Sequence, residues 1–222
     1  NAVTHELKTP IASLRLYLQT LQRRELRDGQ RQEFYGLMLK DTDRLMNTVE
    51  QVLKAGEIPG RKKHLVEVDF NALVERCVEV ACGSHHLQSG ALRYESSLNG
   101  TGSEVNGDPE DLRTAVSNIL DNAVKYSGGN VDVSVQLDLE EQKRLVLRVT
   151  DRGVGIPPAE LKSIFKRFYR VPGRALPQIR GTGLGLFLVR TIAKRHGGRV
   201  SAESAGEGKG ATIIFELPRR AS

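Results

Sequence analysis

The sequence predicts an α + α/β chain, in which a helical hairpin precedes a mixed α/β domain, and two patterns indicate this fold class. In the first 56 residues, apolar side chains recur at alternating spacings of four and three, which is typical of paired amphipathic helices. After residue 66, short β-like runs alternate with helical segments and glycine-rich turns. We therefore expect a first domain at residues 1–56, a linker at 57–66 and a second domain at 67–222.

The first domain is predicted to be an antiparallel two-helix hairpin. The seam of its first helix, residues 1–26, consists of Leu7, Ile11, Leu14, Leu18 and Leu21. A turn at residues 27–30 precedes a second helix that ends near Gly56. Because such a hairpin cannot hide its seam from water alone, we expect a homodimer that closes a four-helix bundle. The alternative is that the seam packs on the second domain.

Residues 4–10, THELKTP, place one histidine on the first helix. At about 100° per residue, His5 and Thr9 lie on the face opposite the leucine seam. Pro10 lacks an amide donor and clashes with the carbonyl of Glu6, so it is expected to bend the helix below the histidine. A single exposed histidine is most often a polar surface residue, and the stretch alone indicates no function.

The second domain is predicted to alternate strands with helices. The expected strands are residues 64–70, 91–98, 104–107, 131–139, 144–150, 199–203 and 211–217. Helices are expected after Asn71 as an N-cap, from Pro109 after the cap Asp108, and from residue 187. The buried stripe expected for the middle helix is Leu112, Val116, Ile119, Leu120 and Ala123.

Three polar residues project together from the helix that starts at Pro109. Asn118 and Asn122 are four residues apart and Lys125 is three further on, so they share one face. Asparagine is a poor helix former, but its amide oxygen suits Mg²⁺, and a lysine supplies a point charge for phosphates. The pattern predicts a magnesium and phosphate site, although taken alone it fits a solvated helix surface equally well.

A glycine-rich turn, residues 151–157, follows the strand at 144–150. The carboxylate of Asp151 at the strand end can accept a hydrogen bond from an exocyclic amine, while Gly153 and Gly155 let a flat ring approach the backbone. Adenine offers an amine where guanine offers a carbonyl. If this turn binds a base, the pattern selects adenine, but taken alone the stretch fits an ordinary glycine-rich turn equally well.

Two further segments lie between this turn and the last strands. Residues 171–180 are basic and have no apolar period, which is typical of a lid or of a plain surface loop. Residues 181–186, GTGLGL, lead directly into a helix, so their backbone amides can bind phosphate with help from the helix dipole. No GK[ST] follows, so this is not a Walker loop.

Composition limits the remaining classes of function. The net charge is +6, but the densest basic run, residues 61–63, lies in the expected linker. We interpret the basic residues as interleaved with acids and expect no nucleic-acid partner.

Cys77 and Cys82 fit neither a redox pair nor a metal site and are expected to be free thiols in a reducing compartment. No run of about 18 apolar residues occurs, and the first residue is not Met, so we expect a fragment without membrane contact.

Taken in order, these motifs resemble those of the catalytic core of bacterial sensor histidine kinases. Residues 4–10 resemble the H box of that family, 118–127 the N box, 151–156 the G1 box, 165–170 the F box and 181–186 the G2 box. The resemblance extends from the first residues to the last strand. It implies a dimerisation and phosphoacceptor hairpin followed by a GHKL-type α/β sandwich that binds ATP, similar to that of gyrase and heat-shock chaperone ATPases.

The resemblance also implies roles for individual residues. His5 would accept the γ-phosphoryl group of ATP, Glu6 would act as general base, and Thr9 would orient water for dephosphorylation of the partner. Asn122 would bind Mg²⁺ with help from Asn118. The residues implied at the phosphates and the base are Lys125, Tyr126, Asp151, Gly153, Gly155, Ile156, Gly181, Thr182, Gly183, Leu184, Gly185 and Leu186.

Two further roles concern the base and the γ-phosphate. Thr212 would support Asp151 through a water molecule. The arginines that could meet the γ-phosphate are Arg167, Arg170, Arg174 and Arg180, of which Arg167 ranks first.

The implied partner is the receiver domain of a response regulator, with phosphatase activity toward that regulator. Ala12 and Leu16 share the outer face of His5 and indicate a docking patch for this domain. The full-length protein is expected to be a membrane-anchored sensor of the bacterial inner membrane, with this segment in the cytoplasm. The alternatives are a GHKL-type ATPase or serine kinase, which would not need the hairpin, and a catalytically inactive ATP-binding scaffold, which would lack His5 or Asn122.

Overall fold

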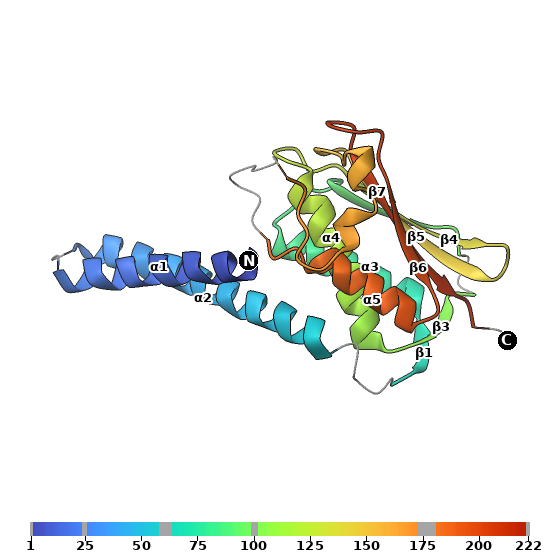
Figure 1. The fold of residues 1–222 in the computed structure, drawn as a ribbon, viewed down its shortest axis with the longest axis horizontal. Helices are drawn as coiled ribbons and strands as arrows, with labels where there is room; N and C mark the ends of the chain where they lie inside the picture. The colour runs from blue at the N-terminus through green and yellow to red at the C-terminus, as the bar shows by residue number, and fades with distance from the viewer. Residues whose placement is uncertain (1, 24–25, 58–63, 99–101, 173–180, 221–222) are drawn as a thin grey trace.

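The computed structural model describes residues 2–23, 26–57, 64–98, 102–172 and 181–220. Helices α1 (Ala2–Arg23) and α2 (Asp28–Glu57) form the predicted antiparallel hairpin, which extends away from the rest of the chain (Figure 1). Helix α1 continues through Pro10, whose side chain is buried. No helix among the described residues is long and apolar enough to span a bilayer.

A single copy of the hairpin leaves much of its apolar surface in water. Tyr17 and Phe34 pack between the two helices with ring centroids 5.5 Å apart. Ile11 and Leu18 of the predicted seam are 54% and 50% exposed, so the alternative that the second domain covers the seam is wrong for these two residues. Further large apolar side chains exposed on the hairpin are Leu16, Tyr35, Leu37, Leu39, Met46, Val49 and Leu53.

The second domain contains every strand and helix that the sequence predicts, with ends shifted by a few residues. Its elements are β1 (Val66–Asp69), α3 (Phe70–Ser84), β2 (Leu92–Ser96), β3 (Glu104–Gly107), α4 (Pro109–Tyr126), β4 (Val133–Glu140), β5 (Arg144–Asp151), η1 (Pro158–Glu160), η2 (Ser163–Phe165), α5 (Gly185–Arg195), β6 (Arg199–Glu203) and β7 (Ala211–Pro218). Residues 58–63 of the expected linker lie outside the described residues.

The domain has two layers, a mixed sheet and three helices on one of its faces (Figure 1). The sheet has the order β2-β4-β5-β7-β6, in which β2 and β4 are parallel and the other pairs are antiparallel. Helix α4 lies between α3 and α5 and packs against both. Strands β1 and β3 form a separate antiparallel ribbon. The ends of β5 and β7 therefore lie side by side beneath α4.

The core lies between the helices and the sheet. Alternate residues of β5 point toward the helices, and Leu145, Leu147 and Val149 are at most 1% exposed. The stripe predicted for α4 is confirmed, since each of its five members is buried. Phe70 of α3 and Phe215 of β7 meet across the layers with ring centroids 6.2 Å apart.

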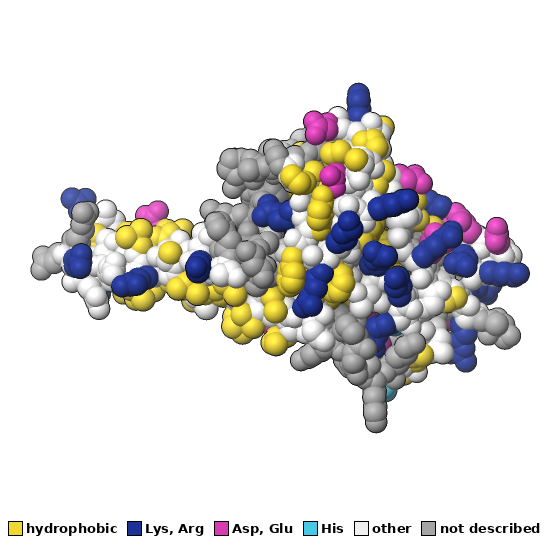
Figure 2. Space-filling view, in the orientation of Figure 1, with side chains coloured by type: hydrophobic (Ala, Val, Ile, Leu, Met, Phe, Trp, Pro, Cys, Tyr) yellow, Lys and Arg dark blue, Asp and Glu magenta, His cyan; other side chains and the backbone are white. Residues whose placement is uncertain are grey.

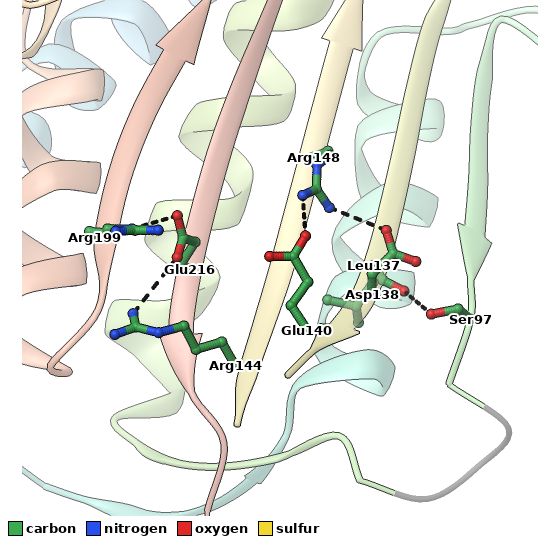
Figure 3. A network of polar contacts seen from close by, with 8 residues as sticks. All are labelled: Ser97, Leu137, Asp138, Glu140, Arg144, Arg148, Arg199 and Glu216. Atoms are coloured by element: carbon green, nitrogen blue, oxygen red, sulfur yellow. Dashed lines mark hydrogen bonds and ion pairs between the residues drawn. The ribbon is translucent and has the colours of Figure 1, made fainter. Parts of the chain in front are cut away.

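The opposite face of the sheet is polar (Figure 3). Arg148 of β5 binds Asp138 at 3.3 Å and also contacts Glu140, both on β4. Glu216 of β7 accepts a hydrogen bond from Arg199 at 2.6 Å. These cross-strand pairs occupy positions that alternate with the core residues, so helices cover only the other face.

Helices α3 and α4 each begin after an N-cap residue whose side chain accepts hydrogen bonds from free backbone amides, but one of the two predicted caps is wrong. Asp108 caps α4 as predicted, accepting hydrogen bonds from the amides of Glu110 and Asp111. The predicted cap of α3 is wrong, because Asp69 accepts the hydrogen bond from Ala72 N at 3.1 Å. Asn71 instead accepts from the Tyr94 hydroxyl at 2.8 Å. An aspartate two positions earlier reaches the free amide, so the helix begins at the buried Phe70.

Candidate functional site

A cavity of about 710 Å³ opens between α4, the start of α5 and the adjoining ends of β5 and β7. Most of the predicted site residues line it. They are Asn118, Asn122, Lys125, Tyr126, Asp151, Gly155, Ile156, Gly181, Thr182, Gly183, Gly185 and Leu186. Segments far apart in the sequence therefore meet at one pocket, as the motif order led us to expect. The volume lies within the range of small-molecule sites, about 300–1,000 Å³.

Asp151 lies at the floor of the cavity, at the end of β5. Its side chain is 7% exposed and its Oδ1 accepts a hydrogen bond from Gly153 N at 2.8 Å. Burial raises the pKa of the Asp151 carboxyl, although backbone amides, among them that of Ala211, act in the opposite direction. A buried carboxylate held in this way presents a fixed acceptor to a ligand amine.

Two glycines are required by close backbone contacts beside Asp151. A Cβ atom on Gly153 would lie 1.9 Å from the carbonyl oxygen of Tyr126. Gly155 has φ +68°, and a Cβ there would lie 2.0 Å from the carbonyl oxygen of Gly206. Gly155 lines the cavity, but Gly153 does not. Gly153 thus joins the turn to the end of α4 rather than facing a ligand.

The polar face of α4 points toward the glycine-rich segment. Asn118 donates a hydrogen bond from Nδ2 to the carbonyl of Thr114 at 2.8 Å, which directs its Oδ1 toward α5. A Cβ atom on Gly185 would lie 2.8 Å from that oxygen, and one on Gly181 would lie 2.7 Å from Lys125 Nζ. The amide oxygens and the ammonium group therefore share the mouth of the cavity with the start of α5.

These groups fit Mg²⁺ that is held together with phosphates. Among the described residues, no cluster of three or more His, Cys, Asp or Glu side chains could hold a metal ion. Asn118 and Asn122 supply neutral amide oxygens, and Mg²⁺ prefers oxygen ligands and completes its shell with water and substrate phosphates.

The glycine-rich segment precedes α5, which begins at Gly185, two residues earlier than predicted. Thr182 is 5% exposed, and its Oγ1 accepts a hydrogen bond from Leu184 N at 3.2 Å. Leu184 is fully buried in the core and does not line the cavity, so its predicted contact with a ligand is replaced by packing. Gly183 and Leu186 do line it.

This region is strongly basic. Residues 161–202 contain ten Lys or Arg residues and no Asp or Glu, so the interpretation that bases and acids are interleaved throughout is wrong here. Figure 2 shows dark blue side chains across the face of the second domain that carries α5, with magenta ones near its upper and right edges. The positive potential around the cavity favours an anionic ligand.

Among the arginines, the structure ranks Arg170 ahead of Arg167. Arg167 lies over the ring of Phe168, 4.9 Å from its centroid, and near that of Phe187 at 5.9 Å, and it does not line the cavity. Arg170 lines the cavity and lowers the pKa of Tyr126, against the larger effect of burial that raises it. Arg174 and Arg180 lie outside the described residues.

The predicted role of Thr212 is wrong. Thr212 pairs with Thr150 on β5, and their hydroxyl oxygens lie 2.9 Å apart. Successive strand residues point to opposite faces of a sheet, so Thr212 faces away from Asp151. Its neighbour Ala211, which pairs with Asp151, lines the cavity instead.

The proposed phosphoacceptor lies on the hairpin. His5 and Glu6 belong to α1, but their side chains lie outside the described part of the chain. Thr9 is half-buried one turn further on. The end of α1 that carries these residues lies beside the second domain rather than at the far tip of the hairpin (Figure 1).

Sequence reasoning missed two parts of the cavity wall. One is Gln51 of α2, which no motif singles out. The other is a side formed by α3 and α4, where His85 Nε2 lies 3.0 Å from Asp121 Oδ1. Only the helical spacing of Ser117 and Asp121, each one residue before a motif asparagine, could have indicated the second part.

Two families match the chain. Residues 107–221 match the family described as histidine kinase-, DNA gyrase B-, and HSP90-like ATPase. The chain belongs to this ATPase family. Residues 1–59 match the His Kinase A (phospho-acceptor) domain, so both domains of a bacterial sensor histidine kinase core are present in the expected order.

The curated relatives are longer proteins. The chain is 29% identical to sensor protein kinase WalK of Staphylococcus saprophyticus over 222 residues, which cover 97% of this chain and 35% of that protein. A WalK of Staphylococcus aureus is 28% identical over 97% of this chain and 52% of its own length. The chain thus spans between a third and about half of these relatives.

Solved structures share the fold. The mycobacterial sensor histidine kinase MprB is 30% identical with a TM-score of 0.59, covering 71% of this chain and 99% of that one. Full-length ShkA in complex with AMPPNP is 25% identical with a TM-score of 0.70, covering 98% and 45%. ThkA in complex with the response regulator protein TrrA is 18% identical with a TM-score of 0.74, covering 98% and 60%, and shows the fold alone.

Proposed function

We propose that this chain is the catalytic core of a two-component sensor histidine kinase, which uses ATP to phosphorylate its own His5. The observation that carries the proposal is the cavity. It brings Asp151, the amides of Asn118 and Asn122, Lys125 and the glycine-rich segment together in a chain whose residues 1–59 match a phosphoacceptor domain.

Asp151 selects the adenine base. Its buried carboxylate lines the cavity and accepts from the exocyclic amine, because an ionised carboxylate has about four acceptor sites and can bind a ligand amine in addition to backbone amides such as that of Gly153. Guanine would place a carbonyl oxygen there, opposite a carboxylate. The wall formed by Tyr126 and Ile156 excludes water from the base.

The phosphates lie at the mouth of the cavity. Backbone amides at the start of α5, the Lys125 ammonium and the Arg170 guanidinium neutralise their charge. Asn122, with Asn118 beside it, holds Mg²⁺, which when bound supplies charge neutralisation on the phosphate oxygens. Phosphoryl transfer then depends mainly on how the chain positions its groups.

A ring nitrogen of His5 attacks the γ-phosphorus. The new N–P bond forms as the bond from the γ-phosphorus to the β–γ bridging oxygen breaks, and ADP leaves with that electron pair. Glu6 acts as the base that holds the other ring N–H, which keeps the attacking nitrogen unprotonated. These two roles rest on the position of the residues in the sequence motif.

The kinase works as a homodimer. The exposed Ile11, Leu18 and neighbouring apolar side chains of the hairpin support closure of a four-helix bundle.

The phosphoryl group passes from His5 to an aspartate of a response-regulator receiver domain, and Thr9 orients water for the phosphatase reaction. ThkA, which shares the fold, is known in complex with such a regulator. The segment lies in the cytoplasm, below a membrane-anchored sensor.

A partition experiment separates the kinase from a GHKL-type ATPase. With γ-labelled ATP and Mg²⁺, a kinase places the label on the chain in amounts up to one per hairpin, whereas an ATPase releases it as inorganic phosphate. Label that appears only as free phosphate, with none on the chain, would overturn the proposal. An inactive scaffold would bind ATP and leave it intact.

Leu16 tests the docking of the receiver domain. Its side chain is 60% exposed on α1. Leu16→Asp is expected to leave autophosphorylation within about twofold of the wild type but to slow transfer to the receiver about tenfold or more, since it places a charge in an apolar contact. Both rates are measured by quenched-flow labelling. Equal loss of both steps would indicate a folding defect, and unchanged transfer would remove Leu16 from the docking surface.

A further inference from the structure

Helix α2 docks on the second domain next to the glycine-rich segment. The hydroxyl of Thr182 donates a hydrogen bond to Gln51 Oε1 at 2.9 Å, across 131 residues of sequence. Around this contact, Thr48 and Ala55 of α2 are 6% and 3% exposed, and Val52 packs against the core of the second domain. The hairpin therefore contributes a side chain to the wall of the cavity itself.

The single proton of the Thr182 hydroxyl is already used in this arrangement. Its oxygen accepts from Leu184 N at 3.2 Å and its single proton goes to Gln51. Thr182 is 5% exposed, so water cannot replace either partner readily. A phosphate oxygen that approaches the start of α5 can gain this donor only if Gln51 gives it up.

We propose that Gln51 is a positioning residue that couples the docking of the hairpin to nucleotide affinity, by competing with the nucleotide for the proton of Thr182. This inference rests on the proposed function, namely that the cavity binds ATP. The docked arrangement holds the glycine-rich segment against α2, and a bound nucleotide releases it. By linkage, whatever draws α2 away from the second domain raises nucleotide affinity by the same factor as the nucleotide weakens docking.

The direction in which Gln51→Ala changes nucleotide affinity shows whether Gln51 competes with the nucleotide or supports the binding loop. If Gln51 merely held the loop in shape, Gln51→Ala would weaken nucleotide binding. Competition predicts the reverse: AMP-PNP with Mg²⁺ binds Gln51→Ala about two- to tenfold more tightly, the net contribution of one hydrogen bond. Isothermal titration calorimetry on the whole chain measures this without any need for phosphoryl transfer.

Two further variants isolate the contact. Thr182→Val removes both the proton and the acceptor at nearly constant volume, so adding Gln51→Ala in that background should leave the affinity unchanged. Glu50→Ala, on the exposed side of the same turn of α2, is the matched control and should bind AMP-PNP like the wild type.

The outcomes separate this inference from the function on which it rests. If the wild type does not bind AMP-PNP, the proposed function fails. If the wild type binds it but Gln51→Ala binds it equally or more weakly, only the competition is overturned. Tightening that persists in the Thr182→Val background would also overturn it, because the effect would then not pass through the hydroxyl.

Discussion

Asp151→Asn is expected to weaken ATP binding by about tenfold to a hundredfold, the contribution of a hydrogen bond to a charged acceptor. The amide would retain an oxygen for Gly153 N but turn its NH₂ group toward the adenine amine, so two donors would face each other. Fluorescent-ATP displacement measures the change. Asp138→Asn on the outer face of the sheet is the control and should bind normally, and equal affinity in both variants would remove Asp151 from the base site.

The same carboxyl predicts a pH dependence. Burial raises the pKa of Asp151 above its ordinary value, and the ionised form is the stronger acceptor for the adenine amine, because protonation removes charge and adds a donor. ATP affinity should therefore be full above this raised pKa and fall as the pH drops through it. Asp151→Asn has no such proton to gain and should lose this component of the pH profile.

Asn122→Ala is expected to reduce autophosphorylation by about a hundredfold or more, since a metal ion contributes several kcal/mol of charge stabilisation to phosphoryl transfer. The loss should be larger in kcat than in ATP affinity, because the base contacts at Asp151 remain. Arg113→Ala serves as the control, because Arg113 lies on the same helix but outside the cavity and pairs with Glu110 at 2.6 Å. Full activity in Asn122→Ala over a Mg²⁺ titration would contradict the assigned ligand.

The sequence predicted the elements whose local chemistry agrees with their packing. Asp108 and Pro109 mark the start of α4, and the apolar period of that helix identifies its buried face, so the polar face was correctly assigned to the site. Asp151 was found because a buried strand ends at a glycine-rich turn. In each case, one short stretch of sequence contains all the residues on which the prediction depends.

The wrong predictions concern residues whose role depends on a one-residue shift in strand register or on contact with a distant part of the chain. Thr212 and Ala211 are neighbours on a strand, and the pleat sends only Ala211 toward the cavity. The choice between Arg167 and Arg170 depends on which side chain lines the cavity, since Arg167 lies over aromatic rings instead, and spacing in the sequence does not determine this. Gln51 lies on the other domain, and no local pattern reports that α2 packs beside Thr182.

The most direct measurement is to locate the phosphoryl group after incubation of the chain with γ-labelled ATP and Mg²⁺. We expect label on the chain that is stable to base but lost in acid, as is typical of a phosphoramidate. This label should be absent from His5→Ala even though this variant binds AMP-PNP as tightly as the wild type. Acid-stable label, or label that persists in His5→Ala, would contradict this expectation.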